Sequence, residues 1–111
     1  MNIGEYKQLA NLIRNDETYK VYDLSQLQNL NVSLTELYPQ KSTSGHSHKE
    51  ADEVYIFIDG VGTMEIGNRT ENVKGGDLIL VPQGDFHRVR NEGTSNLNFW
   101  TIFEKYEGRG K

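Results

Sequence analysis

Apolar and polar residues alternate along most of the chain beyond residue 18. Strand-like stretches recur about every eight to twelve residues, with turn signals rich in Gly, Asn, Asp and Pro between them. Such spacing is typical of a β-sandwich or a β-barrel. The pattern therefore predicts an all-β protein, with strands over residues 19–24, 31–38, 54–58, 63–66, 69–73, 78–81, 86–90 and 97–103.

The N-terminal segment has a different periodicity. Tyr6, Leu9, Leu12 and Ile13 follow helical spacing, with polar residues between them. The segment predicts one short helix over residues 4–15, packed against the outside of the barrel. Since no reactive side chain lies on it, we expect it to act as structural cover or as a dimer contact.

Two predicted strands are unusually apolar. The stretch 78–81 reads as a buried run, and 54–58 is apolar on both faces, unlike a strand with one wet face. The two faces of the second strand are formed by Glu53, Tyr55 and Phe57 on one side and by Val54, Ile56 and Ile58 on the other. If the first face lines the barrel, the second needs cover from another sheet, the helix or a second subunit. A homodimer is therefore a hypothesis.

The size of the chain indicates one domain. Its 111 residues suffice for a single hydrophobic core. We expect residues 1–30 to form the N-terminal helix and an extension, residues 31–105 the barrel, and residues 106–111 a flexible tail. The chain has no Cys, so any metal ion must be held by nitrogen and oxygen ligands.

The charge pattern disfavours two classes of partner. The formal net charge is −4 and no stripe of Lys and Arg forms, so binding to nucleic acid or to a membrane surface is not expected. The longest apolar runs are too short to cross a bilayer, and the N-terminus has no signal-peptide pattern. These features predict a soluble, cytoplasmic protein.

The chemistry of the chain is concentrated in two short segments. His46 and His48 are two residues apart, so on a strand their rings would point to the same side. Glu53 follows closely, and His87 comes from a distant strand after a turn in which Gly84 permits a sharp bend. Any one of these histidines alone would be read as a surface or core residue, but all three histidines of the chain fall in this pattern.

The donor set predicts a metal site. Three imidazoles and one carboxylate suit a divalent transition metal ion (Mn, Fe, Co, Ni, Cu or Zn), and a five- or six-coordinate ion would keep positions open for water or substrate. We therefore predict one metal ion, with positions open to water or substrate, held by His46, His48, Glu53 and His87.

These residues carry a resemblance to a known family. His46-x-His48, with Glu53 after four residues and Gly60 after six more, resembles the first motif of the cupin superfamily. The second motif is matched by Gly76-x5-Pro82-x-Gly84-x2-His87-x3-Asn91. The resemblance implies a jelly-roll, double-stranded β-helix barrel that binds one metal ion through the same four residues. Gln40 stands where the family usually has the first motif's glycine.

The superfamily includes several reaction classes, so the fold does not select an activity. The segments from Gly45 to His48, Glu53 to Tyr55 and Gly60 to Gly62 are similar to those of cupin-type phosphoglucose isomerases. A sugar or sugar-phosphate isomerase or epimerase is thus the first hypothesis. In it, substrate oxygen atoms occupy the open metal positions and a nearby side chain moves a proton.

Tyr55 is the candidate for proton transfer because it shares a face with Glu53, although it is equally well interpreted as a barrel-lining aromatic. Glu36 and Tyr38 are alternatives. The second hypothesis is a metal-dependent lyase or dioxygenase acting on a small organic acid, and the third is a non-catalytic module that binds a small molecule. Arg88 and Arg90 have the parity opposite to His87 and are expected to face outward, which leaves a phosphate group without its usual anchor.

Overall fold

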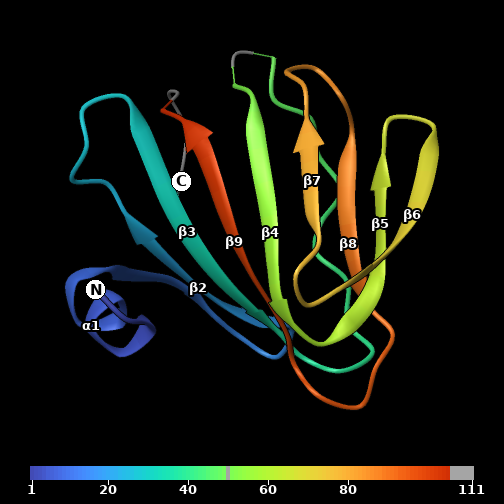
Figure 1. Cartoon of the computed structure of the whole chain (residues 1–111), viewed down its shortest axis with the longest axis horizontal. Coiled ribbons are helices and arrows are strands. Elements are labelled where there is room, and N and C mark those ends of the chain that lie inside the picture. Colours follow the sequence, from blue (N-terminus) through green and yellow to red (C-terminus); the bar gives the residue numbers. More distant parts are fainter. Residues whose placement is uncertain (50, 106–111) are drawn as a thin grey trace.

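The computed structural model describes residues 1–49 and 51–105 (Figure 1). In this part of the chain the elements are α1 (Ile3–Leu9), β1 (Asn11–Asn15), β2 (Tyr19–Leu24), β3 (Leu30–Leu37), β4 (Glu53–Asp59), β5 (Val61–Ile66), β6 (Arg69–Lys74), β7 (Leu78–Val81), β8 (His87–Asn91) and β9 (Leu97–Glu104). The predicted tail 106–111 lies outside the described residues.

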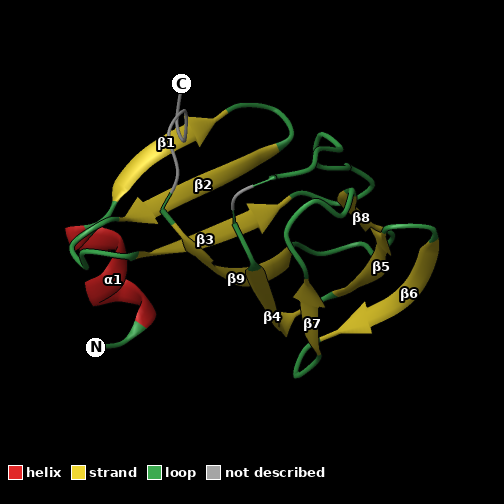
Figure 2. Ribbon diagram, turned by 90° about the horizontal axis from the view of Figure 1, so that it is seen from above, coloured by secondary structure: helices red, strands yellow, loops and turns green. Residues whose placement is uncertain are grey.

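The strands form two antiparallel sheets. The larger sheet has the order β1-β2-β3-β9-β4-β7 and the smaller has the order β6-β5-β8. Viewed from above, the larger sheet curves strongly, so that β1 and β2 fold over toward the side where the smaller sheet lies (Figure 2). This arrangement confirms the prediction of an all-β jelly-roll barrel with a short N-terminal helix. The strands β1 and β2, which fall within the predicted N-terminal extension, are integral parts of the larger sheet.

The core lies between the concave face of the larger sheet and the smaller sheet. Of the two faces of β4, the one formed by Glu53, Tyr55 and Phe57 points inward and is buried. Their neighbours across the sheet, Phe99 and Phe103 on β9, are also buried. The side chains that complete this core are Leu37, Met64, Ile66, Val73, Ile79, Val81, Val89 and Leu97.

The predicted helix over 4–15 is only half right. The helix α1 starts at a capping box, in which the Asn2 side chain accepts from Glu5 N, and it ends at Leu9. Residues 11–15 form β1 instead, and the side chain of Leu12 is exposed. The helix does not continue through residues 11–15 because the backbone of β1 pairs with β2. The fold leaves Leu9 and Leu12 exposed, so a longer helix would not bury its apolar face there.

The prediction that 78–81 is a buried run is also wrong. Only Ile79 and Val81 are buried, while Leu78 and Leu80 remain 55% and 62% exposed. The cause is position, because β7 is an edge strand of the larger sheet and nothing in the described chain covers its outer face.

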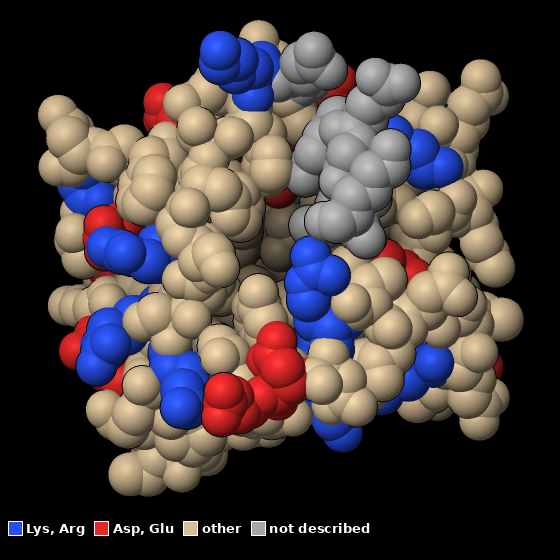
Figure 3. All heavy atoms as spheres, turned by 180° about the vertical axis from the view of Figure 1, so that it is seen from behind, with Lys and Arg blue, Asp and Glu red and all other residues tan. Residues whose placement is uncertain are grey.

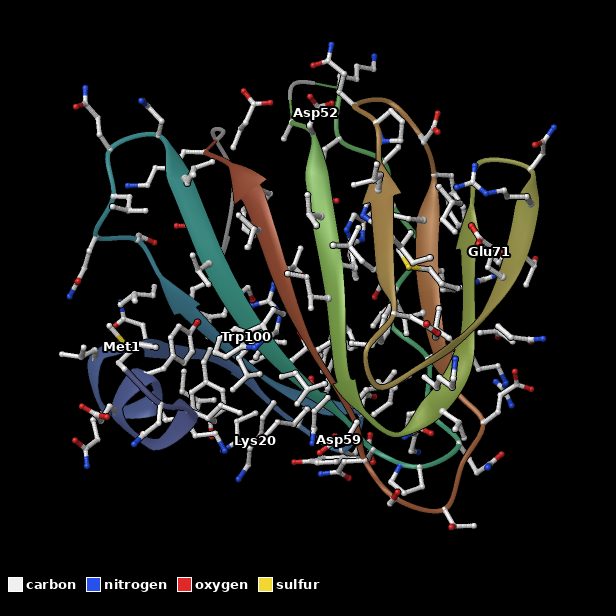
Figure 4. All side chains as sticks on the ribbon, in the orientation of Figure 1. Met1, Lys20, Asp52, Asp59, Glu71 and Trp100 are labelled. Atoms are coloured by element: carbon white, nitrogen blue, oxygen red, sulfur yellow. The ribbon has the colours of Figure 1, made fainter. Side chains whose placement is uncertain are left out.

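Part of the outer face of the larger sheet is covered by α1. Tyr6 is buried, its ring meets Trp100 edge-on at 4.8 Å, and its hydroxyl donates to Tyr22 O and Val32 O. Figure 4 shows Trp100 on this face. Ile56, from the outward-facing set of β4, lines an apolar depression beside Trp100, so the helix supplies some of the cover that the sequence required. Within the described residues, no helix is long and apolar enough to span a membrane.

The turn at Gln40 explains the glycine usually found there. Gln40 has φ of 65°, in the left-handed region where glycine is favoured. Its side chain Nε2 donates to Gly93 O at 2.9 Å, which ties this turn to the loop between β8 and β9. A side-chain hydrogen bond thus helps to stabilise this turn with Gln40 in place of glycine.

Candidate metal centre

A short backbone bridge places His46 beside His87. His46 N donates to His87 O at 3.2 Å, and His87 N donates to His46 O at 2.9 Å. Next to this bridge, Gly84 N donates to His48 O at 2.6 Å. The segment carrying the first two histidines is an isolated bridge alongside β8 rather than a strand of either sheet. The backbone nevertheless holds it in register, so all three rings converge.

The three imidazoles are close enough to share an ion. Their ring centroids are 4.5 Å apart for His46 and His48, 4.5 Å for His46 and His87, and 5.5 Å for His48 and His87. One nitrogen from each ring lies within 4.8 Å of the others. Two nitrogens that each bind an ion at about 2.1 Å are at most about 4.2 Å apart. Small side-chain adjustments therefore bring the cluster to ligation distance.

Glu53 completes the cluster from the first position of β4. Its side chain is buried, with Oε2 at 2.8 Å from His87 Nε2 and Oε1 at 3.9 Å from His48 Nε2. Glu53 Oε2 and His87 Nε2 are buried and have no well-formed hydrogen bond in the described chain. Buried polar atoms of this kind are costly unless something binds them. A divalent ion bound by both atoms would remove that cost, so the residues present fit the metal site.

The hydrogen bonds around the rings select the correct nitrogen. His46 Nδ1 lies 3.1 Å from Ser44 O, and His87 Nδ1 lies 3.1 Å from Asp85 O. A carbonyl can only accept, so each Nδ1 carries the hydrogen and each Nε2 is left as a lone-pair donor. The tight turn through Gly84, with φ of 89°, delivers His87 in this orientation.

The site perturbs its own proton affinities. Burial lowers the pKa of His46, and the neighbouring rings of His87 and His48 lower it further. Burial also lowers the pKa of His87, but the contact with the Glu53 carboxylate outweighs burial, so the pKa of His87 is raised. His46 is therefore harder to protonate than a free imidazole, and His87 is easier to protonate.

A cavity of about 190 Å³ adjoins the cluster. His46 and Glu53 form part of its wall, as does Tyr55, whose ring centroid is 5.8 Å from that of His87. The rest of the wall is rich in hydroxyl groups and contains one cation; it consists of Ile13, Arg14, Tyr19, Val21, Ser33, Thr35, Thr43, Ser44, Phe99 and Thr101. The face opposite to that of Figure 1 is hollowed near its centre, with Lys and Arg side chains at the edge of the hollow (Figure 3).

The structure separates the three predicted proton-transfer candidates. Tyr55 lies in the cavity wall, as its face predicted. Glu36 lies on the outer face of β3, whereas its neighbour Thr35 faces the cavity. The Glu36 carboxylate pairs with Lys7 Nζ at 2.6 Å. Tyr38 has the same parity as Glu36 and follows the end of the strand. Glu36 is therefore not brought to the histidines, and neither alternative is part of the described cavity wall.

The outward orientation predicted for the two arginines of β8 is confirmed. Arg88 donates to Glu65 Oε1 at 2.8 Å, and Arg90 donates to Ser42 Oγ at 3.3 Å, both on exposed surface. Neither arginine is in the described wall of the cavity.

The sequence interpretation missed Arg14 and the hydroxyl wall. Ser33 and Thr35 fall within the predicted strand over 31–38, but the alternation there does not say which face points inward, because both faces carry apolar and polar residues. Thr101 lies beside Ser33 across the sheet. Arg14 was assigned to a helix, so no signal pointed to the cavity.

Comparison with known proteins places these features in a family. Residues 33–103 match the family model described as a cupin domain. The structure of TT1209 from Thermus thermophilus superimposes with a TM-score of 0.77 at 26% identity, covering 94% of this chain and 97% of that one. An oxalate decarboxylase from Bacillus subtilis gives a TM-score of 0.78 at 26% identity, over 86% of this chain and 27% of that chain.

Similarity to curated proteins is more partial. The chain is 27% identical over 66 residues to an oxalate-binding protein from Thermotoga maritima, covering 60% of this chain and 54% of the relative. The chain thus spans about half the length of this relative, and 42% of the length of an uncharacterised protein from Methanocaldococcus jannaschii that is 35% identical over 52 residues.

Proposed function

The chain belongs to the cupin domain family, and from this premise we propose that it is a metal-dependent enzyme acting on a small, oxygen-rich metabolite. The observation that carries the proposal is the convergence of His46, His48 and His87, with the Glu53 carboxylate beside them, at the wall of a cavity. A structural site is usually closed by four tetrahedral ligands, whereas a site beside a cavity can keep exchangeable positions.

The size of the cavity limits the substrate. Pockets for drug-sized ligands are typically about 300–1,000 Å³, and this cavity measures about 190 Å³. The hydroxyl groups of Ser33, Thr35 and Thr101 offer donors and acceptors for a polar substrate. A substrate of a few carbon atoms with several oxygen atoms fits this wall.

The chemistry then divides between the metal ion and the protein. A bound divalent ion would supply Lewis-acid polarisation of a substrate oxygen and electrostatic stabilisation of developing negative charge. Tyr55 is the side chain we assign to proton transfer, because its phenol group belongs to the cavity wall near His87. The buried faces around Phe57 and Phe99 exclude water from one side of the site.

A small organic acid is the substrate class we favour, with lyase chemistry. The support comes from relatives named for oxalate, one of them a B. subtilis oxalate decarboxylase with Mn(II) centres that is 27% identical to this chain. Manganese is therefore the first metal to test. Isomerisation or epimerisation of a small sugar is the second candidate, and it is supported by the position of Tyr55 in the wall. A binding module without catalysis is the third, since the T. maritima relative is named as a binding protein.

The proposal is tested by metal content and turnover together. We expect purified protein to hold close to one divalent ion per chain, and His87→Ala to lose both the ion and any activity toward a panel of small organic acids and sugars. Oxygen uptake with the ferrous protein distinguishes a dioxygenase from a lyase or an isomerase. Full activity in protein stripped of metal would refute the proposed function.

We also propose that the protein is a cytoplasmic homodimer. The exposed Leu78 and Leu80 lie on the outer face of β7, next to the half-buried Val54 and Ile56 of β4. This apolar surface is where a second copy would pack. Sedimentation that shows only monomer at micromolar concentration would remove the dimer.

A further inference from the structure

We propose that Arg14 is the residue that recognises the substrate, and that the substrate class it selects is a small carboxylate. The inference rests on the proposed function, because it places the carboxylate in the same cavity as the metal site. It assigns to β1, a strand that carries no metal ligand, the task of determining specificity.

A β-bulge aims Arg14 into the cavity. In the pairing of β1 with β2, Leu12 lies opposite Tyr22 and Arg14 lies opposite Val21, so Ile13 is an extra residue. Without the bulge, Arg14 would share the parity of Leu12, whose side chain is exposed. With it, Arg14 shares the face of the buried Val21, and both line the cavity. Bulges commonly re-aim a side chain in this way.

The Arg14 guanidinium has unused hydrogen-bond donors. Within the described chain its one recorded polar contact is the bond from Nη1 to Ile13 O at 3.1 Å, and it forms no ion pair. By contrast, Arg69 and Arg88 are each paired with a carboxylate. A guanidinium has five N–H donors in a planar fork that matches a carboxylate. Most of the fork of Arg14 is therefore available to a ligand.

Arg14 is also the one cation in the described wall of the cavity. The single carboxylate in that wall, Glu53, is turned toward His87 and His48. The remaining polar side chains of the wall carry hydroxyl groups, apart from the imidazole of His46. A cation that faces a cavity and forms no ion pair with a protein carboxylate attracts an anionic ligand.

The curvature of the sheet brings the two charged ends of the cavity together. The strands β1 and β4 are separated by β2, β3 and β9 in the larger sheet, yet Arg14 and Glu53 line the same cavity. The fold-over of β1 and β2 seen in Figure 2 accounts for this. Arg14 is exposed as well as lining the cavity, so its guanidinium lies where the cavity meets solvent. A small acid bound there would hold its carboxylate on Arg14 and present its other oxygen atoms to the metal site.

The charge and volume favour a carboxylate over a phosphate. A phosphate group usually has several convergent cationic groups around it, and the described wall offers one within about 190 Å³. One guanidinium matches one carboxylate as a bidentate pair.

The test uses a matched pair of probes on the Mn(II)-loaded full chain. Glycolate and glycolamide have nearly the same size and differ in charge, and oxalate serves as a third probe. We would measure their Kd values by calorimetry for wild type, Arg14→Gln and Arg14→Lys. Lys20→Gln is the matched control, because it removes the same charge from the outer face of the neighbouring strand, on the side of the sheet where Trp100 lies (Figure 4).

We expect Arg14→Gln to weaken glycolate and oxalate binding by about tenfold or more, as for the loss of a hydrogen bond to a charged group. Glycolamide should change by less than about threefold, Arg14→Lys should show an intermediate loss, and Lys20→Gln should match wild type. Melting temperatures and manganese content, measured on the same samples, should be unchanged in all variants.

Two results would overturn the inference while leaving the proposed function intact. One is a manganese-loaded wild type that binds glycolate no better than glycolamide, or binds neither. The other is an equal loss of glycolate affinity in Arg14→Gln and Lys20→Gln. A wild-type protein that holds no manganese or other divalent ion would instead refute the proposed function, and the inference with it.

Discussion

Replacing Glu53 with glutamine should affect the metal-free and the metal-loaded protein in opposite directions. Glu53 is 4% exposed, and its Oε2 lies 2.8 Å from His87 Nε2. With Nδ1 of His87 donating to Asp85 O, a neutral His87 presents a lone pair at Nε2, to which the new amide can donate. At pH 8 in the absence of metal, Glu53→Gln therefore removes a buried charge, and we expect stability to stay the same or rise.

In the presence of metal, the same change removes a charged ligand. Altering even the partners of metal ligands typically costs about 10- to 100-fold in affinity, so we expect at least this loss here. At a fixed excess of metal, that factor corresponds to about 1.4–2.7 kcal/mol of lost stabilisation. For a domain of this size each kcal/mol shifts Tm by about 4 °C. The metal-induced rise in Tm should therefore be smaller by about 5–10 °C in Glu53→Gln than in wild type.

The assay is a pair of thermal melts for each variant, with chelator and with excess manganese. Glu71→Gln is the matched control, since Glu71 is a half-exposed carboxylate on β6 that pairs with Arg69 and not with the histidines; it is labelled in Figure 4. It should reproduce the wild-type metal shift. If Glu53→Gln also kept the full shift, the assignment of Glu53 as a ligand would be wrong. If it destabilised the metal-free protein strongly at pH 8, the argument that the buried charge is costly without metal would be wrong.

The same structure supports four further predictions. The pKa of His87 is raised in the folded, metal-free protein. Its pair with Glu53 therefore adds stability that is complete below the unfolded pKa of about 6.5 and is lost as pH rises through the folded pKa. In metal-free melts from pH 5 to 8, the Tm of wild type should rise relative to that of Glu53→Gln as the pH is lowered. Loaded protein should release its ion over the same acid range as imidazoles protonate, measured by dialysis and elemental analysis. Tyr55→Phe should lower kcat by about 100-fold or more with metal content unchanged; an unchanged kcat would assign the proton transfer elsewhere. The free energy of unfolding of Gln40→Gly should lie within about 1 kcal/mol of wild type, because relief of backbone strain at φ of 65° offsets the lost hydrogen bond to Gly93 O. Gln40→Val should lower the free energy of unfolding by about 2 kcal/mol or more, measured by chemical denaturation. Equal stabilities of the two variants would contradict this account.

Local patterns in the sequence predicted the positions of most strands and turns, because these positions do not depend on which segments pack together. Strand alternation and turn residues located β2 to β9 closely, because the period of two and the glycines at Gly67 and Gly84 are local requirements of the backbone. The spacing of His46 and His48, together with His87 after its turn, predicted the cluster because all three histidines of the chain fall in one motif pattern.

The tertiary structure decided which face of each strand is inside. On β3 both faces carry polar residues, and the inward position of Ser33 and Thr35, with Glu36 outside against Lys7, follows from packing against β9 and α1. The exposure of Leu80 likewise follows from the edge position of β7.

The same limit applies to Arg14. Whether residues 11–15 form a helix or a strand depends on the free hydrogen-bonding edge that β2 offers, and the direction of the Arg14 side chain depends on one extra residue in that pairing. The sequence alone therefore predicted the histidine cluster and the succession of strands, which are local or motif properties. The composition of the cavity wall, with its hydroxyls and its one cation, depends on pairings between distant segments. Only those pairings fix the register of each strand and the face of the sheet on which each side chain lies.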